Sequence, residues 1–250
     1  MSSFTVMGIE GIPEVSAGDD LALLIIEALD KQGIRLEDED IVIVTSKIVS
    51  KAEGRIIARN DVQPSSFAIQ LAQLTKKDPF EVEIILRESL RPIKVSDHVL
   101  IMETKQGFIC ANAGIDQSNV GDDDVFLLLP LDADASAMKI RTSLENHYGI
   151  NLAVIISDTF GRPWRMGQTN VAIGISGMSA ISDYKGKYDY YGRELKSTEI
   201  AITDQIAASA EMVMGKADGI PVAVIRGYSY PKGDGKAKHL IRPKQMDLFR

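Results

Sequence analysis

The apolar residues of this chain gather in short runs that are separated by polar residues and glycine. Residues 41–44 and 152–156 are unbroken apolar runs rich in β-branched side chains, which is typical of strands buried on both faces. Residues 99–103 and 108–111 flank a turn at residues 104–107, which predicts a β-hairpin. Further strand candidates lie at residues 125–129, 171–175 and 222–225.

Other segments carry helix signals. Asp19 or Asp20 can cap a first-turn N–H, and Asp78 followed by Pro79 is a cap with a first-turn proline. Gly215 lies just past the strongest helical pattern, as a C-cap would. The predicted helices are residues 21–29, from Ser65 or Ser66 to Lys77, 80–90, 134–148 and 198–214. Because helices and strands alternate irregularly, we expect an α+β fold with mixed sheets rather than a doubly wound parallel sheet.

Composition narrows the function. The 250 residues suffice for one large domain or two small ones, and 28 basic against 35 acidic residues give a net charge of −7. This acidic balance disfavours a general nucleic-acid or membrane-surface binder. The single cysteine, Cys110, excludes an intramolecular disulfide and is expected to be a packed thiol. Residues 1–10 have no secretory pattern and no apolar run could cross a bilayer, so we expect a cytoplasmic protein.

Two polar stretches interrupt the apolar pattern and carry candidate chemistry. Residues 110–119 and 157–165 each follow a predicted strand, and they contain Asp116 and Asp158 respectively. Polar residues beyond strand ends are common ligand sites, and carboxylates suit Mg²⁺ or Mn²⁺. Each aspartate could equally cap a turn or a helix. The residues alone leave both interpretations open.

Cations accompany these stretches. Lys47 and Lys51 are expected to bracket a short turn after a buried strand, and Arg162 and Arg165 lie in the second polar stretch. Such residues either face solvent or neutralise a polyanion such as a nucleoside triphosphate. No Walker A or GxGxxG motif is present, so a nucleotide site must be built differently. The tyrosine-rich residues 184–192 fit a substrate loop or a dimer contact equally well.

At these same residues the sequence resembles the coenzyme F420-0:L-glutamate ligase family, also called F420 gamma-glutamyl ligases. The resemblance runs nearly end to end, and its most specific parts are Ala-Asn-Ala-Gly-Ile-Asp-Gln-Ser-Asn at residues 111–119 and Ser-Asp-Thr-Phe-Gly-Arg-Pro-Trp-Arg at residues 157–165. The other matching stretches are residues 11–13, 18–20, 45–47, 50–55, 167–174, 192–195 and 247–250.

The resemblance implies a GTP-dependent ligase that adds L-glutamate to coenzyme F420-0, and a second, gamma-linked, to F420-1. GTP would phosphorylate the precursor's terminal carboxylate, and the glutamate amine would attack the acyl phosphate, so that GDP and phosphate are released. The family uses Mg²⁺ or Mn²⁺, with two sites expected, and K⁺ stimulates some members. The expected form is an intertwined homodimer with one ligase domain over residues 1–250 and no C-terminal nitroreductase-like domain.

The resemblance also assigns residues by position. Asp116 and Asp158 match ligands of a first metal, and Thr159 matches a ligand of a second. Lys216 stands where a family member would offer an amide oxygen to the second metal, and an ammonium has no lone pair to ligate with. Either backbone or water then substitutes, or Lys216 neutralises phosphate itself. The positions matching GTP contacts are Ile12, Pro13, Glu14, Val15, Ser46, Lys47, Lys51, Asn119, Met214, Gly215, Lys216, Ala217, Asp218, Gly219, Ile220 and Pro221.

Two alternatives remain at this level. One is a protein that binds a nucleotide or a deazaflavin without catalysis, although paired metal-type carboxylates argue against it. The other is an amide ligase of the same chemistry that acts on a different carboxylate. No catalytic side chain beyond the metal and GTP positions is predicted.

Overall fold

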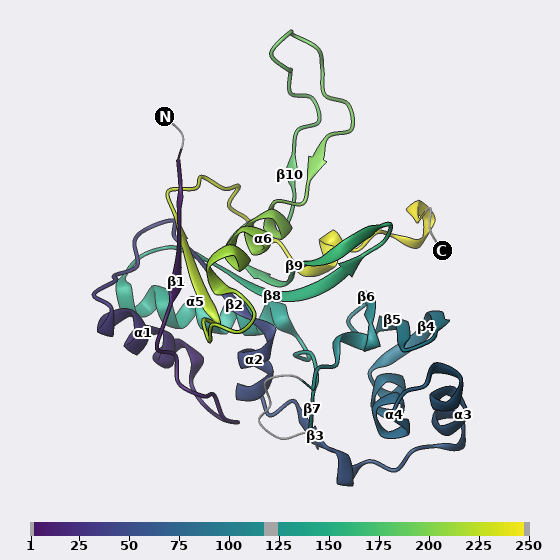
Figure 1. The fold of residues 1–250 in the computed structure, drawn as a ribbon. Helices are drawn as coiled ribbons and strands as arrows, with labels where there is room; N and C mark the ends of the chain where they lie inside the picture. Colours follow the sequence, from purple (N-terminus) through teal and green to yellow (C-terminus); the bar gives the residue numbers. More distant parts are fainter. Residues whose placement is uncertain (1–2, 118–124, 248–250) are drawn as a thin grey trace.

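A computed structural model describes residues 3–117 and 125–247 of the chain, and its centre is a five-stranded mixed sheet (Figure 1). The strand order is β1-β12-β2-β8-β9, in which β2 and β8 pair in parallel and every other pair is antiparallel. The strands of this sheet are β1 (Thr5–Ile9), β2 (Ile41–Thr45), β8 (Ala153–Arg162), β9 (Arg165–Ser176) and β12 (Val222–Arg226).

Helices cover both faces of the central sheet, as the unbroken apolar runs predict. Val42 and Val44 of β2 belong to one core with helices α1 (Leu21–Lys31) and α5 (Ala133–Tyr148). Ile41 and Ile43 point the other way, into a second core against α6 (Ile202–Met214). Because side chains alternate along a strand, a strand between two helical layers must be apolar at every position.

A smaller lobe with its own apolar core lies beside the sheet (Figure 1). Its antiparallel sheet has the order β4-β5-β6 and packs on helices α3 and α4. Short elements connect the lobe to the rest of the chain. The lobe and its connections comprise α2 (Ser46–Ala52), β3 (Ile56–Ala58), η1 (Arg59–Asp61), α3 (Ser66–Thr75), α4 (Pro79–Arg87), β4 (Ser89–Ser96), β5 (Val99–Thr104), β6 (Ile109–Ala111), η2 (Asn112–Gly114) and β7 (Val125–Leu127).

The α+β class with mixed sheets and hairpins is confirmed, and so are the local signals that set helix starts. The carboxylate of Asp20 accepts from the N–H groups of Ala22 and Leu23, and Ser65 and Asp78 cap α3 and α4 in the same way. The β5–β6 hairpin forms as predicted. Such caps are local interactions, which explains why the sequence alone predicts them.

Four predictions about elements are wrong. Lys47 and Lys51 do not bracket a turn but lie on helix α2, which begins directly after β2. Residues 157–162 are not a loop, because β8 continues to Arg162 through its pairing with β9. The last long helix begins at Ile202 rather than residue 198, and α4 ends at Arg87, where the unpredicted strand β4 follows.

The tyrosine-rich segment forms an arm that projects from the body of the molecule (Figure 1). Its base is the short ladder of β10 (Ser182–Asp183) with β11 (Glu199–Ile200). Tyr188, Tyr190 and Tyr191 are largely exposed along it. The last described elements are the short helices η3 (Ala237–Leu240) and η4 (Lys244–Met246). Within residues 3–117 and 125–247, no helix combines the length and apolar character that a membrane span requires.

Candidate functional site

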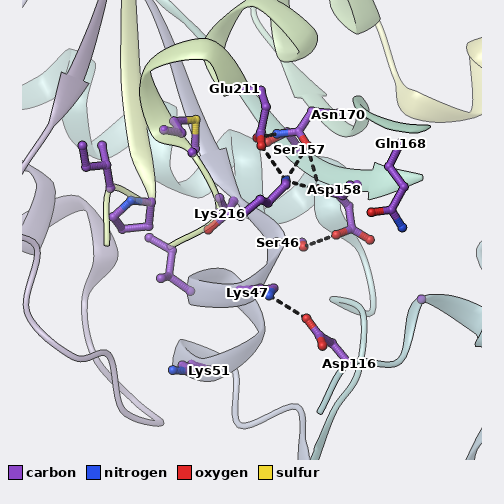
Figure 2. A pocket seen from close by; sticks show the side chains of 18 of the residues that line it. Ser46, Lys47, Lys51, Asp116, Ser157, Asp158, Gln168, Asn170, Glu211 and Lys216 are labelled. Carbon is purple, nitrogen blue, oxygen red and sulfur yellow. Dashed lines mark hydrogen bonds and ion pairs between the residues drawn. The ribbon is translucent and has the colours of Figure 1, made fainter. Parts of the chain in front are cut away.

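A cavity of about 670 Å³ opens where the parallel strands β2 and β8 reach their carboxyl-terminal parts. Its walls come from the 12–15 segment, helix α2, the η2 region of the small lobe, the β8–β9 hairpin and the turn after α6. Segments far apart in the sequence therefore line one cavity (Figure 2). In parallel strands, side chains at the carboxyl edge are held rigidly while the following segments stay accessible.

Asp158 lies on β8, and its carboxylate points into this cavity (Figure 2). Ser46, the first residue of α2, donates its hydroxyl to Asp158 Oδ1 at 3.0 Å. Burial raises the pKa of Asp158 to about 6, and the nearby carboxylate of Asp116 adds to the rise. The backbone N–H of Thr159, Ser46 and the charge of Lys47 lower the pKa in part. A cation bound beside this half-buried carboxylate would stabilise its charged form.

Asp116 faces Asp158 from the small lobe (Figure 2). Two backbone hydrogen bonds to Leu127, of 3.0 and 2.8 Å, fix its main chain, and its carboxylate pairs with Lys47 Nζ at 2.6 Å. In the described part of the chain no group of three or more His, Cys, Asp or Glu side chains could hold a metal ion. Two converging carboxylates still fit Mg²⁺ or Mn²⁺, which usually fill other positions with water and substrate phosphate.

Lys47 and Lys51 lie four residues apart on α2 and therefore present both ammonium groups on one helix face. The side chain of Lys51 is only 9% exposed, and its Nζ lies 2.5 Å from Oε1 of the exposed Glu14. Both lysines line the cavity with Asp116 and Asp158. Cations on this wall are suited to the phosphates of a nucleotide.

A second polar cluster lines the same cavity and consists of Thr159, Asn170, Glu211 and Lys216. Figure 2 shows Asn170 and Glu211 beside Lys216. The ammonium of Lys216 donates to Thr159 Oγ1 at 2.6 Å and to Asn170 Oδ1 at 3.2 Å. It also pairs with Glu211 Oε1 at 2.8 Å. Lys216 therefore makes contacts within the protein at the position where the resemblance implies a second-metal ligand.

The structure brings together nearly all the residues that the sequence singled out. Asn119 lies outside the described residues, and Asp218, Arg162 and Arg165 do not line the cavity. The predicted residues that line it are Ile12, Pro13, Glu14, Val15, Ser46, Lys47, Lys51, Asp116, Asp158, Thr159, Met214, Gly215, Lys216, Ala217, Gly219, Ile220 and Pro221.

Sequence reasoning missed several polar residues of the cavity wall, among them Ser157, Gln168, Asn170 and Glu211. Asn170 is 2% exposed and donates to Glu211 Oε2 at 2.6 Å, so the two form a fixed pair between β9 and α6. The sequence does contain a signal for Asn170, because this residue lies inside the stretch 167–174 that resembles the family. No sequence signal indicates Glu211, because a glutamate within a helix ordinarily lies on the face exposed to solvent.

Cys110 also lines the cavity, but it is buried, as predicted for a packed thiol. Burial raises the pKa of its thiol to about 12, and the negative charge of Asp158 adds to the effect. Because the thiolate is the reactive form, Cys110 is unsuited to act as a nucleophile.

Comparisons with known proteins identify the family of the chain. Residues 10–227 match the profile of the F420-0:Gamma-glutamyl ligase family. The chain is 50% identical over 249 residues to the coenzyme F420:L-glutamate ligase of Methanothermobacter thermautotrophicus, covering 98% of each protein. It is 49% identical over 216 residues to that of Methanocaldococcus jannaschii, covering 86% of each, and 42% identical over 258 residues to that of Methanopyrus kandleri, covering 100% of each. The chain therefore belongs to the F420-0:gamma-glutamyl ligase family.

Proposed function

We propose that this protein is a coenzyme F420:L-glutamate ligase that uses GTP. The observation that carries the proposal is the convergence of Asp116, Asp158, Lys47 and Lys51 on one cavity, in a chain of this family. Its substrates are GTP, L-glutamate and the coenzyme F420 precursor, all of them anionic. The expected cytoplasmic location suits these small soluble substrates.

The reaction proceeds in two steps. An oxygen of the precursor's terminal carboxylate attacks the γ-phosphorus of GTP, so that an acyl phosphate forms and GDP leaves. The glutamate amine then attacks the acyl carbon, the new amide forms, and phosphate and a proton are released. Lys47 and Lys51 orient the phosphates and offset the negative charge that develops during transfer. A repeat of both steps on the product adds the second, gamma-linked glutamate.

The carboxylates of Asp116 and Asp158 would hold one Mg²⁺ or Mn²⁺, which when bound supplies positive charge to the transferring phosphoryl group. Ser46 fixes one oxygen of Asp158 by its hydrogen bond, so the carboxylate is oriented before a cation arrives. Lys47 pairs with Asp116, and its ammonium lies where it can form an ion pair with a phosphate oxygen of the bound nucleotide. K⁺, which stimulates some members of the family, would add a further positive charge beside the nucleotide phosphates.

We also propose that two chains form a homodimer through the projecting arm. Tyr190 is 95% exposed and Tyr191 84% exposed, and tyrosine supplies large contact area at low entropic cost. Light scattering at several concentrations tests this proposal: it predicts twice the mass of one chain at each of them. Replacing the four arm tyrosines by serine should then give monomers. A mass of one chain throughout, or a dimer that survives this change, contradicts the assignment.

The experiment that tests the function is a mass-spectrometric assay. The protein is incubated with GTP, Mn²⁺, L-glutamate and coenzyme F420-0, and the expected result is a mass gain of one or two glutamyl units. When the precursor carboxylate carries ¹⁸O, one labelled oxygen should appear in the released phosphate, because that oxygen bridges carbon and phosphorus in the acyl phosphate. Omitting GTP is the control.

The assay also separates the two alternatives. Binding of GTP and F420-0 without any mass gain would favour a non-catalytic binding protein. GTP-dependent glutamylation of another carboxylate, but not of F420-0, in a panel of acids would favour a related amide ligase.

A further inference from the structure

The ammonium of Lys216 lies in a cage of oxygen atoms on the cavity wall (Figure 2). Thr159 Oγ1, Asn170 Oδ1 and Glu211 Oε1 lie 2.6, 3.2 and 2.8 Å from its Nζ. The three oxygens come from β8, β9 and α6, three elements of the rigid central layers. A hydroxyl, an amide oxygen and a carboxylate converging on one point are also the donors that a hard divalent cation prefers.

The cage is built independently of the lysine. Thr159 donates its hydroxyl to Asn170 Oδ1 at 2.7 Å, and the Asn170 amide donates to Glu211 Oε2 at 2.6 Å. Asn170 is 2% exposed, so these bonds fix its amide orientation inside the protein. An exposed ion pair alone would hold a lysine weakly. Here two further oxygens, themselves held in place, share the ammonium.

We propose that the ammonium of Lys216 takes the place of a second divalent cation, so that the chain binds one divalent ion per active site. An ammonium offers three donors and no acceptor, so it cannot ligate a metal. A divalent ion bound to the same three oxygens would lie within hydrogen-bond distance of a like charge, and their repulsion excludes it. The donors do not fit a second metal while Lys216 is seated.

This inference rests on the proposed function, and it concerns which positive charges neutralise the nucleotide phosphates at that site. Thr159, which contributes one oxygen to the cage, directly follows Asp158 on β8, so the cage lies next to the carboxylate pair. A divalent ion at Asp116 and Asp158 and a tethered ammonium at the cage would flank the same phosphates. Lys216 then supplies from the chain a positive charge that the resemblance assigns to a metal ion.

The test counts bound Mn²⁺ by equilibrium dialysis, with a non-hydrolysable GTP analogue at saturation. The wild-type protein should bind one Mn²⁺ per chain. The Lys216→Gln variant removes the ammonium and adds an amide oxygen, so it should bind two, and its electron paramagnetic resonance spectrum should show coupling between two neighbouring Mn²⁺ ions. Lys139→Gln, an exposed change on α5, makes the same chemical substitution elsewhere and should still bind one.

Other outcomes are decisive as well. Two Mn²⁺ ions in the wild type, or one in Lys216→Gln, would overturn the inference. If Lys216→Gln fails to fold, Lys216→Met empties the cage without adding an oxygen, and a second bound Mn²⁺ is again expected at higher concentration. Because stoichiometry is measured without turnover, a missing ligase activity would contradict the proposed function alone. No bound Mn²⁺ in the wild type would contradict both.

Discussion

The two ends of the parallel β2–β8 pair carry acidic side chains in opposite situations: Asp40 precedes β2, and Asp158 lies on β8 beyond the end of β2. At the amino end, Asp40 is 1% exposed and accepts from Arg226 at 3.0 and 2.7 Å, and from the backbone N–H of Glu37 at 2.8 Å. These bonds to Asp40 raise the pKa of Arg226. At the carboxyl end, burial is the main influence on Asp158 and raises its pKa to about 6, although Ser46 donates to it.

The difference separates a charge that the fold pairs internally from one that we propose binds a cation. Arg226 matches both oxygens of Asp40 with two parallel donors and also donates to the carbonyl of Arg35 at 2.7 Å, which joins β12 to the segment before β2. Asp158 instead faces a cavity and a second carboxylate. Removing one partner of a buried ion pair leaves the other charge uncompensated, which is costly, whereas a carboxylate with a raised pKa that faces a cavity is a candidate ligand for a cation.

The largest expected effect comes from breaking the amino-end pair. Asp40→Ala leaves the Arg226 guanidinium without its buried partner, so we expect a loss of about 3–5 kcal/mol in the free energy of unfolding. Urea unfolding measures it. The matched control is Asp38→Ala, an exposed carboxylate that accepts from Asn151, for which we expect a much smaller loss. Equal losses in the two variants would contradict a structural role for the Asp40–Arg226 pair.

Breaking the carboxyl end should affect turnover instead. Asp158→Asn and Asp116→Asn keep the side-chain shape but weaken the hold on a divalent cation, so we expect kcat to fall by at least about a hundredfold. Stability should change little, because removing a half-buried charge also removes its desolvation cost. Steady-state kinetics with urea unfolding of the same samples checks both. Near-normal turnover in both variants would contradict the assignment.

The close packing of α5 on the sheet that presents these groups can be tested at Gly174 of β9. A Cβ there would lie 2.3 Å from the carbonyl oxygen of Ala133, the first residue of α5, so helix and strand would have to separate. We expect Gly174→Ala to cost about 1–3 kcal/mol in thermal or urea unfolding. Gly161→Ala on β8 is the control, since its Cβ would meet nothing within 4 Å. Wild-type stability for Gly174→Ala would contradict the close approach.

A smaller effect is expected for the nucleotide-facing wall. Lys51→Ala removes a cation that lines the cavity, so GTP should bind about tenfold more weakly while the KM for glutamate stays unchanged. Titration calorimetry for GTP and initial rates for glutamate measure the two. Lys139→Ala on α5 provides the control. A raised glutamate KM with unchanged GTP affinity would move Lys51 to the other substrate.

The smallest expected effect is an absence of reaction. Because burial raises the pKa of Cys110 to about 12, the folded protein should resist iodoacetamide at mildly alkaline pH. Unfolding returns the thiol to its ordinary, lower pKa, and alkylation in urea should then be complete. Mass spectrometry reads out both states. Rapid alkylation of the folded protein would show that Cys110 is reactive.

Local chemistry explains what the sequence could predict. Asp20, Ser65 and Asp78 cap helices through neighbours two or three residues away, and β2 is apolar at every buried position. The wrong predictions arise where a residue distant in the sequence determines the secondary structure. Ser157 is polar and still lies in a strand because β9 pairs with it, and no local pattern distinguishes such a strand from a loop. The same holds for the site: Asn170 meets Glu211 only through the packing of β9 on α6.

If phosphoryl transfer takes place at the carboxyl end of the β2–β8 pair, the metal and the nucleotide must bind there together. A crystal structure with Mn²⁺ and a non-hydrolysable GTP analogue tests this, because anomalous scattering locates the metal. We expect a Mn²⁺ peak between the carboxylates of Asp116 and Asp158, with the γ-phosphate beside it and within reach of Lys47. A Mn²⁺ ion and triphosphate bound outside this cavity, with Asp116 and Asp158 untouched, would contradict it.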